Sequence, residues 1–286
     1  MSVGKVAWGS LDVIVLGPVE DLPPRRVYLW RPPVAIAPGL LLMQDGEKVF
    51  PDAAGPDSPG DLGWDVPGAL RKRWEYDGRA APAVMAVEAS RNRAGEYMPE
   101  ESVVGAAGEG FLEAHRDRVY RPRSRAYLSF LLTEALPWAR RQGIDTDPCT
   151  LIGCSRGALF SIYALCKSPL EFAGAACLSP HWPHGDGLVV AWLDKNLPSP
   201  GRHRLYFDHG DQGLDAAYKP YQQRVNSIMA SHGFTAAGDY LSLFFPGHGH
   251  EERFWRERVG HAIAFVLDGR VVNEEEPLWE KTSIAP

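Results

Sequence analysis

The chain has 286 residues, of which 45% are hydrophobic, 10% aromatic and 23% charged, and this is enough apolar sequence to bury a sizeable core. Its formal net charge is −6, from 30 lysines and arginines against 36 aspartates and glutamates, so no nucleic-acid partner is expected. No apolar run reaches the roughly 20 residues that span a bilayer. Residues 1–10 also lack the pattern of a signal peptide, so we expect no membrane association.

The first part of the chain predicts a sheet edge that is followed by buried strands. The apolar or β-branched stretches predicted as strands are 11–16, 26–30, 40–43 and 83–87. The first two are separated by Gly-Pro and Pro-Pro pairs and predict an antiparallel edge within residues 1–33. Residues 64–76 predict a helix, whereas 51–63 and 88–101 are rich in Pro, Gly or polar residues and predict surface loops.

From residue 124 onward, helical patterns alternate with strand patterns. The predicted helices are 124–139, 158–166, 187–197, 214–232 and 251–267, and the predicted strands are 150–152, 172–179, 204–208 and 240–245. This alternation predicts an α/β fold with a mostly parallel central sheet flanked by helices. The segment 271–286 is a polar tail, and no segment resembles a linker, so we expect residues 1–286 to form a single domain.

The stretch at 150–159 has the sequence form of a nucleophile elbow. Gly153-Cys154-Ser155-Arg156-Gly157 fits Gly-x-Ser-x-Gly, with an apolar strand pattern before it and an apolar helical pattern after it. The two glycines suit a sharp turn in which the serine backbone is strained and its neighbours approach closely. Ser155 is therefore the candidate nucleophile.

Polar residues that follow the later strands supply the other groups that a serine nucleophile needs. Serine requires a base to take its proton, and His248 and His250 both follow the last predicted strand. An acid must orient that histidine, and Asp211 and Asp215 both follow the strand at 204–208. The order serine, acid, histidine is the chain order of α/β-hydrolases.

The cysteines and histidines do not form a metal pattern. The spacing of the cysteines is not that of a metal site, and they are read as buried, reduced thiols: Cys149, Cys154, Cys166 and Cys177. The pair His181 and His184 lacks a carboxylate or cysteine at ligand spacing. We therefore expect no metal and, from the reduced thiols, a cytoplasmic location.

Seven separated blocks of the chain carry a family pattern. They are Leu42 to Phe50 (M-H-D-G-Q-N-L-F in the family), Glu96 to Pro99 (E-Y-M-P), Tyr127 to Phe130 (Y-L-x-F), Gly153 to Leu159 (G-x-S-M-G-G-L), Cys177 to Trp182 (L-S-P-x-W), Leu214 to Gln222 (L-D-A-x-Y-x-P-Y-Q) and His250 to Trp255 (H-N-E-x-x-W). In this order they resemble the esterase D / enterochelin-esterase-like family of α/β-hydrolases, from about residue 40 to residue 267.

The resemblance implies an α/β-hydrolase fold and a serine carboxylic-ester hydrolase that works through an acyl-enzyme with a Ser-His-Asp triad. It assigns the base to His250 and the acid to Asp215, with Asp211 as the alternate because it stands nearer the strand end. It implies no cofactor and a small-molecule ester as substrate, and it leaves the oligomeric state and the particular ester open. An acyltransferase of the same fold and a non-catalytic binding protein are the alternatives.

Further residues are expected to complete the site. An oxyanion hole is predicted from the N–H of Arg156, which follows the nucleophile, and from the turn that contains Gly46 and Glu47. The residues expected to line a substrate pocket are His181, Tyr97 and Trp182, of which Trp182 fits core packing equally well. Arg156 and Ala158 depart from the family pattern, where Met and Gly stand, and this puts the substrate rather than the chemistry in doubt.

Overall fold

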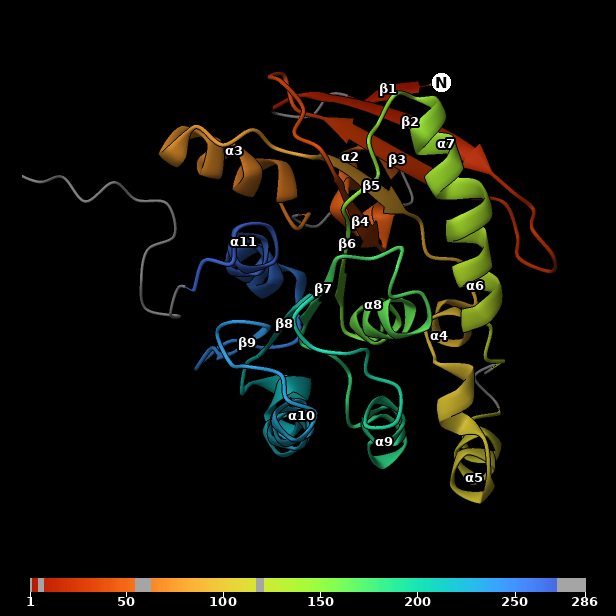
Figure 1. Cartoon of the computed structure of the whole chain (residues 1–286). Coiled ribbons are helices and arrows are strands. Elements are labelled where there is room, and N and C mark those ends of the chain that lie inside the picture. The colour runs from red at the N-terminus through yellow and green to blue at the C-terminus, as the bar shows by residue number, and fades with distance from the viewer. Residues whose placement is uncertain (1, 5–7, 55–62, 117–120, 272–286) are drawn as a thin grey trace, which may run out of the picture.

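The computed structural model describes residues 2–4, 8–54, 63–116 and 121–271 (Figure 1). Within them, nine strands form one sheet in the order β1-β2-β3-β5-β4-β6-β7-β8-β9. The strands are β1 (Ser2–Gly4), β2 (Ser10–Leu16), β3 (Arg25–Arg31), β4 (Leu40–Gln44), β5 (Ala83–Val87), β6 (Cys149–Cys154), β7 (Gly174–Leu178), β8 (Arg204–His209) and β9 (Tyr240–Phe244). Strands β1 to β3 pair antiparallel, as does β3 with β5, and all pairs from β5 to β9 are parallel.

Helices cover both faces of the sheet. They are α1 (Gly46–Val49), α2 (Pro51–Ala54), α3 (Val66–Asp77), α4 (Arg93–Glu96), α5 (Ala106–Ala114), α6 (Ser124–Phe130), α7 (Leu136–Arg141), α8 (Arg156–Lys167), α9 (Leu188–Leu193), α10 (Lys219–Ser231) and α11 (Glu252–Asp268). Three short 3₁₀ helices are described: η1 (Glu100–Val103), η4 (His184–Asp186) and η5 (Gly213–Ala217). A π-helical segment, η3 (Leu131–Ala135), joins α6 to α7. The predicted mostly parallel α/β architecture is confirmed.

The central strands have apolar side chains on both faces because each face carries its own core. Every residue of β4, β5, β6 and β7 is buried, as is typical of parallel strands covered by helices. Leu41 and Ile152 pack in the core that includes α3 and α11, while their neighbours Leu42 and Leu151 pack in the core that includes α8. In Figure 1, α3 and α11 accordingly lie on one side of the sheet and α6, α7 and α8 on the other.

Two segments predicted as loops contain helices. Residues 51–54 form α2, while 55–62 of the same predicted loop lie outside the described residues. The segment 88–101 holds α4 and the start of η1. One of its polar side chains, Glu96, is buried and accepts from Arg25 at 2.7 Å. The predicted tail is described only at Val271. Within the described residues, the helices are all too short or too polar to cross a membrane.

Candidate active site

The elbow forms where β6 runs into α8. Ser155 has φ 57° and ψ −121°, a conformation that non-glycine residues adopt rarely. Its N–H donates to the Leu178 carbonyl at 2.9 Å, which fixes the turn against β7. A Cβ added at Gly153 would lie 2.3 Å from the carbonyl carbon of Gly157, so glycine is required where strand and helix cross. The turn therefore holds the Ser155 hydroxyl at the carboxyl end of the sheet.

Two short contacts join Ser155 to a histidine and an aspartate. His250, in the loop between β9 and α11, has Nε2 at 2.7 Å from Ser155 Oγ. Its Nδ1 lies 2.7 Å from Oδ1 of Asp215, which lies in η5 after β8. Because an ionised carboxylate can only accept, Nδ1 carries the ring proton and Nε2 is left to accept from the serine hydroxyl. The three side chains, from three strand ends, thus form one hydrogen-bonded chain.

Asp215 is held by several donors in a buried place. Its relative exposure is 1%, and Oδ2 accepts from the Gly210 N–H at 2.9 Å and from Ser179 Oγ at 2.7 Å. Burial by itself would raise the pKa of Asp215, but the hydrogen bonds from His250 and from these two donors lower it below its ordinary value. Asp215 is therefore a carboxylate at neutral pH.

The alternates left open by the sequence lie elsewhere. The Asp211 carboxylate is exposed and accepts from the Gly247 N–H and from Gln212 Nε2, both at 2.8 Å. His248 has Nε2 at 3.6 Å from Glu257, and its ring contacts the rings of Phe245 and Phe254 at a tilt. The structure thus brings Asp215 and His250 to Ser155, and it does not bring Asp211 there.

The residues expected to form an oxyanion hole begin two helices. Arg156 is the first residue of α8, and Gly46 begins α1 directly after Asp45, whose backbone is left-handed with φ 57°. A Cβ added at Gly157 would lie 3.1 Å from Gln44 Cβ, so the end of β4 and the first turn of α8 are in close contact. Helix N-termini present N–H groups that have no partner within the helix.

Arginine and glutamate side chains surround the turn after β4. Arg93 donates to both carboxylate oxygens of Asp45, with Nη2 at 2.7 Å from Oδ2. The charge of Arg93 is therefore already compensated by a fully buried carboxylate. The Glu47 carboxylate turns toward the loop after β5 and accepts from the Ala89 N–H at 3.0 Å.

His181 lies beside Ser155 and His250. Its N–H donates to the Ser155 carbonyl at 3.3 Å, and its ring centroid is 6.2 Å from that of His250. Burial and the nearby Arg156 charge lower the pKa of His181 to about 4, so the ring is neutral at pH 7. Its Nδ1 contacts the hydroxyl of Tyr218, whose ring also meets His250 edge-on. We did not predict Tyr218 as a site residue, although it stands in a matched block, L-D-A-x-Y.

Trp182 and Tyr97 are in the core rather than at a surface that a substrate could reach. Both have 0% relative exposure. Trp182 Nε1 donates to Gln222 at 2.9 Å, and the Tyr97 hydroxyl accepts from the Asp45 N–H at 3.2 Å. The two rings pack inward because their apolar faces are then removed from water, and these hydrogen bonds give their polar atoms partners inside the core.

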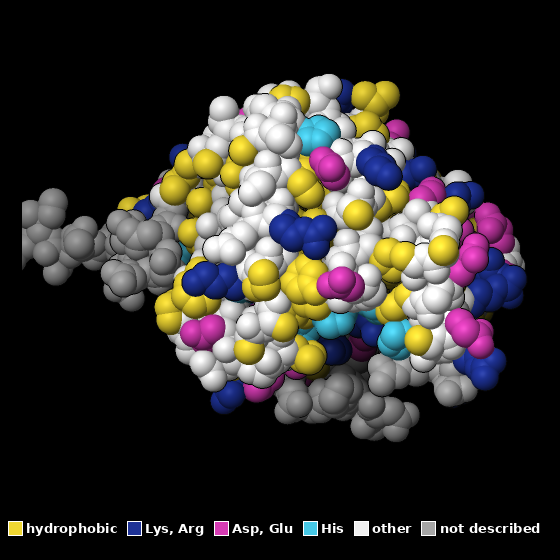
Figure 2. Space-filling view, turned by 90° about the horizontal axis from the view of Figure 1, so that it is seen from below, with side chains coloured by type: hydrophobic (Ala, Val, Ile, Leu, Met, Phe, Trp, Pro, Cys, Tyr) yellow, Lys and Arg dark blue, Asp and Glu magenta, His cyan; other side chains and the backbone are white. Residues whose placement is uncertain are grey.

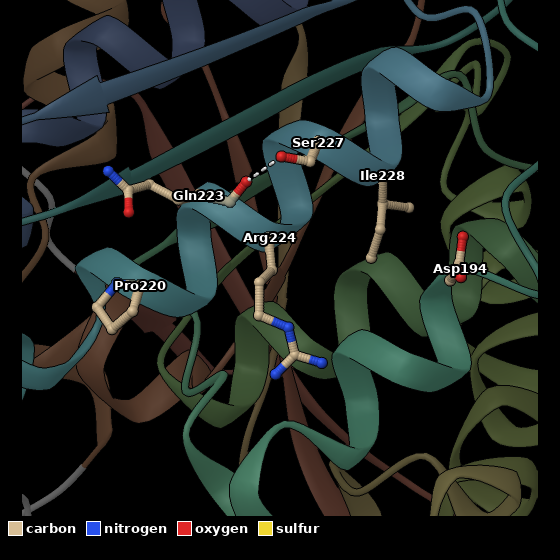
Figure 3. Close-up of a pocket in the computed structure, with 6 residues that line it drawn as sticks. All are labelled: Asp194, Pro220, Gln223, Arg224, Ser227 and Ile228. Atoms are coloured by element: carbon tan, nitrogen blue, oxygen red, sulfur yellow. Dashed lines mark hydrogen bonds between the residues drawn. The ribbon is translucent and has the colours of Figure 1, made fainter.

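The surface is hollowed in more than one place. Seen from below, histidine side chains gather beside a recess at one edge of the molecule, where cationic and acidic side chains also show (Figure 2). A separate shallow pocket between α9 and α10 is lined by Asp194, Pro220, Gln223, Arg224, Ser227 and Ile228. Figure 3 shows Arg224 extending from α10, with Asp194 across from it at the end of α9. The cluster around Ser155 contributes nothing to this pocket.

The described residues contain no group of three or more His, Cys, Asp or Glu side chains arranged to hold a metal ion. All four cysteines are free, and three of them are buried. Burial raises the pKa of Cys154, the neighbour of Ser155, well above its ordinary value. That thiol is therefore a poor nucleophile beside the serine.

Comparison with known proteins gives a family and a fold. Residues 70–261 match the model of a family described as Putative esterase. Comparison with curated protein sequences gives no match. Among solved structures, the enterobactin and salmochelin hydrolase IroE has a TM-score of 0.64 at 17% identity, with 90% of this chain and 96% of that chain covered.

Two further solved structures have the same architecture. The siderophore hydrolase EstB from Aspergillus nidulans has a TM-score of 0.62 at 13% identity and covers 96% of this chain and 99% of its own. Enterochelin esterase from Shigella flexneri has a TM-score of 0.61 at 17% identity and covers 90% of this chain and 58% of its own. The structural similarity to these three proteins shows that this chain has the α/β-hydrolase fold.

Proposed function

The chain belongs to the Putative esterase family and is a serine esterase, and from this premise we propose that it hydrolyses small-molecule carboxylic esters through an acyl-enzyme on Ser155. The observation that carries the proposal is the pair of 2.7 Å contacts that link Ser155, His250 and Asp215. This is the arrangement in which a base, itself oriented by an acid, can take the proton of a serine as it attacks.

The proposed reaction has two halves. Ser155 Oγ attacks the ester carbonyl carbon while its proton passes to His250 Nε2, and the imidazolium is stabilised by the Asp215 carboxylate. The tetrahedral intermediate collapses when His250 returns the proton to the leaving alcohol. In the second half, His250 takes a proton from a water molecule as the water oxygen attacks the acyl carbon. The bond from Ser155 Oγ to the acyl carbon then breaks, His250 returns its proton to Ser155 Oγ, and the carboxylic acid leaves.

The negative charge of each intermediate needs donors that are already in place. We assign these donors to the N–H of Arg156 and to the N–H groups of the turn at Gly46 and Glu47. The close approach of Gln44, at the end of β4, to Gly157, in the first turn of α8, supports the assignment because it brings the starts of α1 and α8 near each other. Donors of this kind typically contribute about a hundred- to a thousandfold to kcat.

The first test is Ser155→Ala, assayed on p-nitrophenyl acetate. We expect kcat to fall by about 10⁴-fold or more, because no nucleophile remains. Ser227→Ala, which changes a serine of α10 whose Oγ donates within its own helix, is the control and should retain wild-type activity. Far-ultraviolet circular dichroism should be the same for both variants.

Two further measurements separate this proposal from its alternatives. A fluorophosphonate probe should label Ser155 in the wild type, and an absence of labelling would favour a non-catalytic binding protein. Product analysis with added acceptor alcohols should give mainly the free acid, whereas mainly the transferred ester would indicate an acyltransferase. Enterobactin is the first natural ester to test, since the structurally similar IroE is described as an enterobactin hydrolase.

A further inference from the structure

Ser179 occupies an unusual position directly after β7. It is fully buried, and its backbone is left-handed with φ 41°, a region that costs energy for a residue with a side chain. Its N–H donates to Oδ1 of Asp208 at 3.0 Å. The strained backbone is therefore tied to the neighbouring strand β8, and it places the serine hydroxyl between Asp215 and helix α11.

The Ser179 hydroxyl makes three hydrogen bonds whose directions are fixed by chemistry. Its Oγ lies 2.7 Å from Asp215 Oδ2, 3.1 Å from Trp255 Nε1 and 2.8 Å from Arg258 Nη2. The indole and guanidinium nitrogens can only donate. Both lone pairs of Oγ are thus occupied by α11, and its single proton has one acceptor, the Asp215 carboxylate.

A buried charge stands behind this hydroxyl. Arg258 has 0% relative exposure, and its Nη1 lies 3.6 Å from Asp208 Oδ1 and 3.9 Å from Asp215 Oδ2. Asp208 also accepts from the Tyr206 hydroxyl at 2.9 Å. Arg258 is therefore the cation that two buried carboxylates share, and its donation to Ser179 polarises the O–H bond that points at Asp215.

We propose that Ser179, held by Trp255 and Arg258, is a positioning residue that fixes the carboxylate of Asp215 so that Oδ1 faces His250. The inference rests on the proposed function, in which Asp215 orients the base. With Oδ2 held by Ser179 and by the Gly210 N–H, rotation of the carboxylate breaks two hydrogen bonds at once. The Nδ1 proton of His250 then has one fixed acceptor throughout the reaction.

The test is Ser179→Ala, assayed for kcat and KM separately. Loss of a hydrogen bond to a charged group corresponds to about a 10- to 100-fold change, so kcat should fall by that factor. KM should stay within about twofold, because the side chain of Ser179 is buried and does not touch substrate. Labelling of Ser155 by a fluorophosphonate should slow by a similar factor as kcat.

The matched control is Ser102→Ala. Ser102 is also buried, and its hydroxyl also donates one hydrogen bond at 2.7 Å, but to the Pro99 carbonyl. This variant should keep wild-type kcat and KM. A folded Ser179→Ala protein whose kcat matches that of Ser102→Ala overturns the inference.

A second variant decides the matter if Ser179→Ala does not fold. Arg258→Lys keeps the buried charge but not the planar fork that reaches Ser179, and kcat should fall about tenfold with KM unchanged. Wild-type kcat in that variant overturns the inference. Activity in Ser155→Ala would overturn the proposed function, whereas an inactive Ser155→Ala beside a fully active Ser179→Ala overturns the positioning role alone.

Discussion

Two ionic clusters with buried carboxylates flank the elbow, and they differ in how their arginines are shared. On the side of β4 and β5, Arg93 forks onto Asp45 and Arg25 forks onto Glu96, each guanidinium with its own carboxylate. On the side of β8 and α11, Arg258 lies 3.6 and 3.9 Å from two carboxylates. Its Nε and Nη1 have no hydrogen-bond partner among the described residues.

The difference matches what each side has to do in the proposed reaction. A one-to-one forked pair fixes two side chains in one geometry and keeps its charge constant. In the shared cluster, by contrast, Asp215 faces a histidine that gains and loses a proton in every turnover. A cation at some distance stabilises that carboxylate without competing with His250 for its oxygen. We therefore expect substitutions beside β4 and β5 to change mainly the free energy of unfolding, and substitutions beside β8 and α11 to change mainly kcat.

The largest effect should come from Asp215→Asn. An amide cannot stabilise the imidazolium and can present the wrong partner to Nδ1, so kcat should fall about a thousand- to ten-thousandfold with a folded protein. The rate of p-nitrophenyl acetate hydrolysis measures this. The matched variant Asp211→Asn changes an exposed carboxylate and should stay within about twofold of wild type. A larger loss in Asp211→Asn than in Asp215→Asn would reverse the assignment of the acid.

On the other side, Arg25→Met should affect stability rather than chemistry. Arg25 and Glu96 have side-chain exposures of 2% and 1%, and breaking a buried pair leaves an uncompensated charge. The free energy of unfolding should fall by about 3–5 kcal/mol, as measured by urea unfolding, while kcat per folded molecule stays near wild type. Arg71→Ala removes an exposed helical pair with Glu75 and should cost under about 1 kcal/mol. Equal losses in the two variants would contradict the comparison.

Glu47 should give the smallest effect, and one that depends on pH. Burial and the neighbouring Asp45 charge raise the pKa of Glu47 from 4.5 to about 7. The folded state thus binds the proton more tightly, so this contribution to stability is fully present below about pH 4.5 and is lost as pH rises through about 7. Glu47→Gln keeps an acceptor for the Ala89 N–H and should be roughly 1–2 kcal/mol more stable than wild type at pH 8.

The same variant should show no such gain at pH 4.5, where wild-type Glu47 is already neutral when folded. Urea unfolding at the two pH values makes the measurement. Glu75→Gln, on the exposed face of α3, is the control and should show no comparable difference between them. A gain of equal size at both pH values would mean that Glu47 does not titrate as described.

The sequence alone was sufficient for features that are encoded locally. Gly153 and Gly157 predict the elbow because strand and helix cross there at backbone distance. The strand and helix patterns predict the mostly parallel sheet, which the structure confirms, because each element carries its own periodicity. Chain order and the H-x-E-x-x-W match selected His250 over His248.

Other features depend on contacts between distant elements and were beyond the sequence. Asp211 and Asp215 both follow β8, and the family pattern favoured Asp215 but kept Asp211 as the alternate. The path of η5 places the Asp215 carboxylate, not that of Asp211, beside His250. The burial of Tyr97 and Trp182 likewise depends on partners elsewhere in the chain. The burial of Arg258, by contrast, is visible in the sequence. It lies between Trp255 and Val259 on the apolar side of α11, where the helical pattern predicts a buried position.

The distances along the chain between the joined groups have a consequence for synthesis. Ser155 and His250 are 95 residues apart in sequence, and Lys48 pairs with Glu252 across 204 residues. At roughly 5–20 residues per second, a ribosome finishes the elbow about 5 to 20 s before it adds His250, the proposed base. Under the proposed mechanism, a nascent chain would lack the histidine that Ser155 needs, and esterase activity would begin only once α11 has emerged and docked. Protein synthesis itself therefore delays the onset of catalysis.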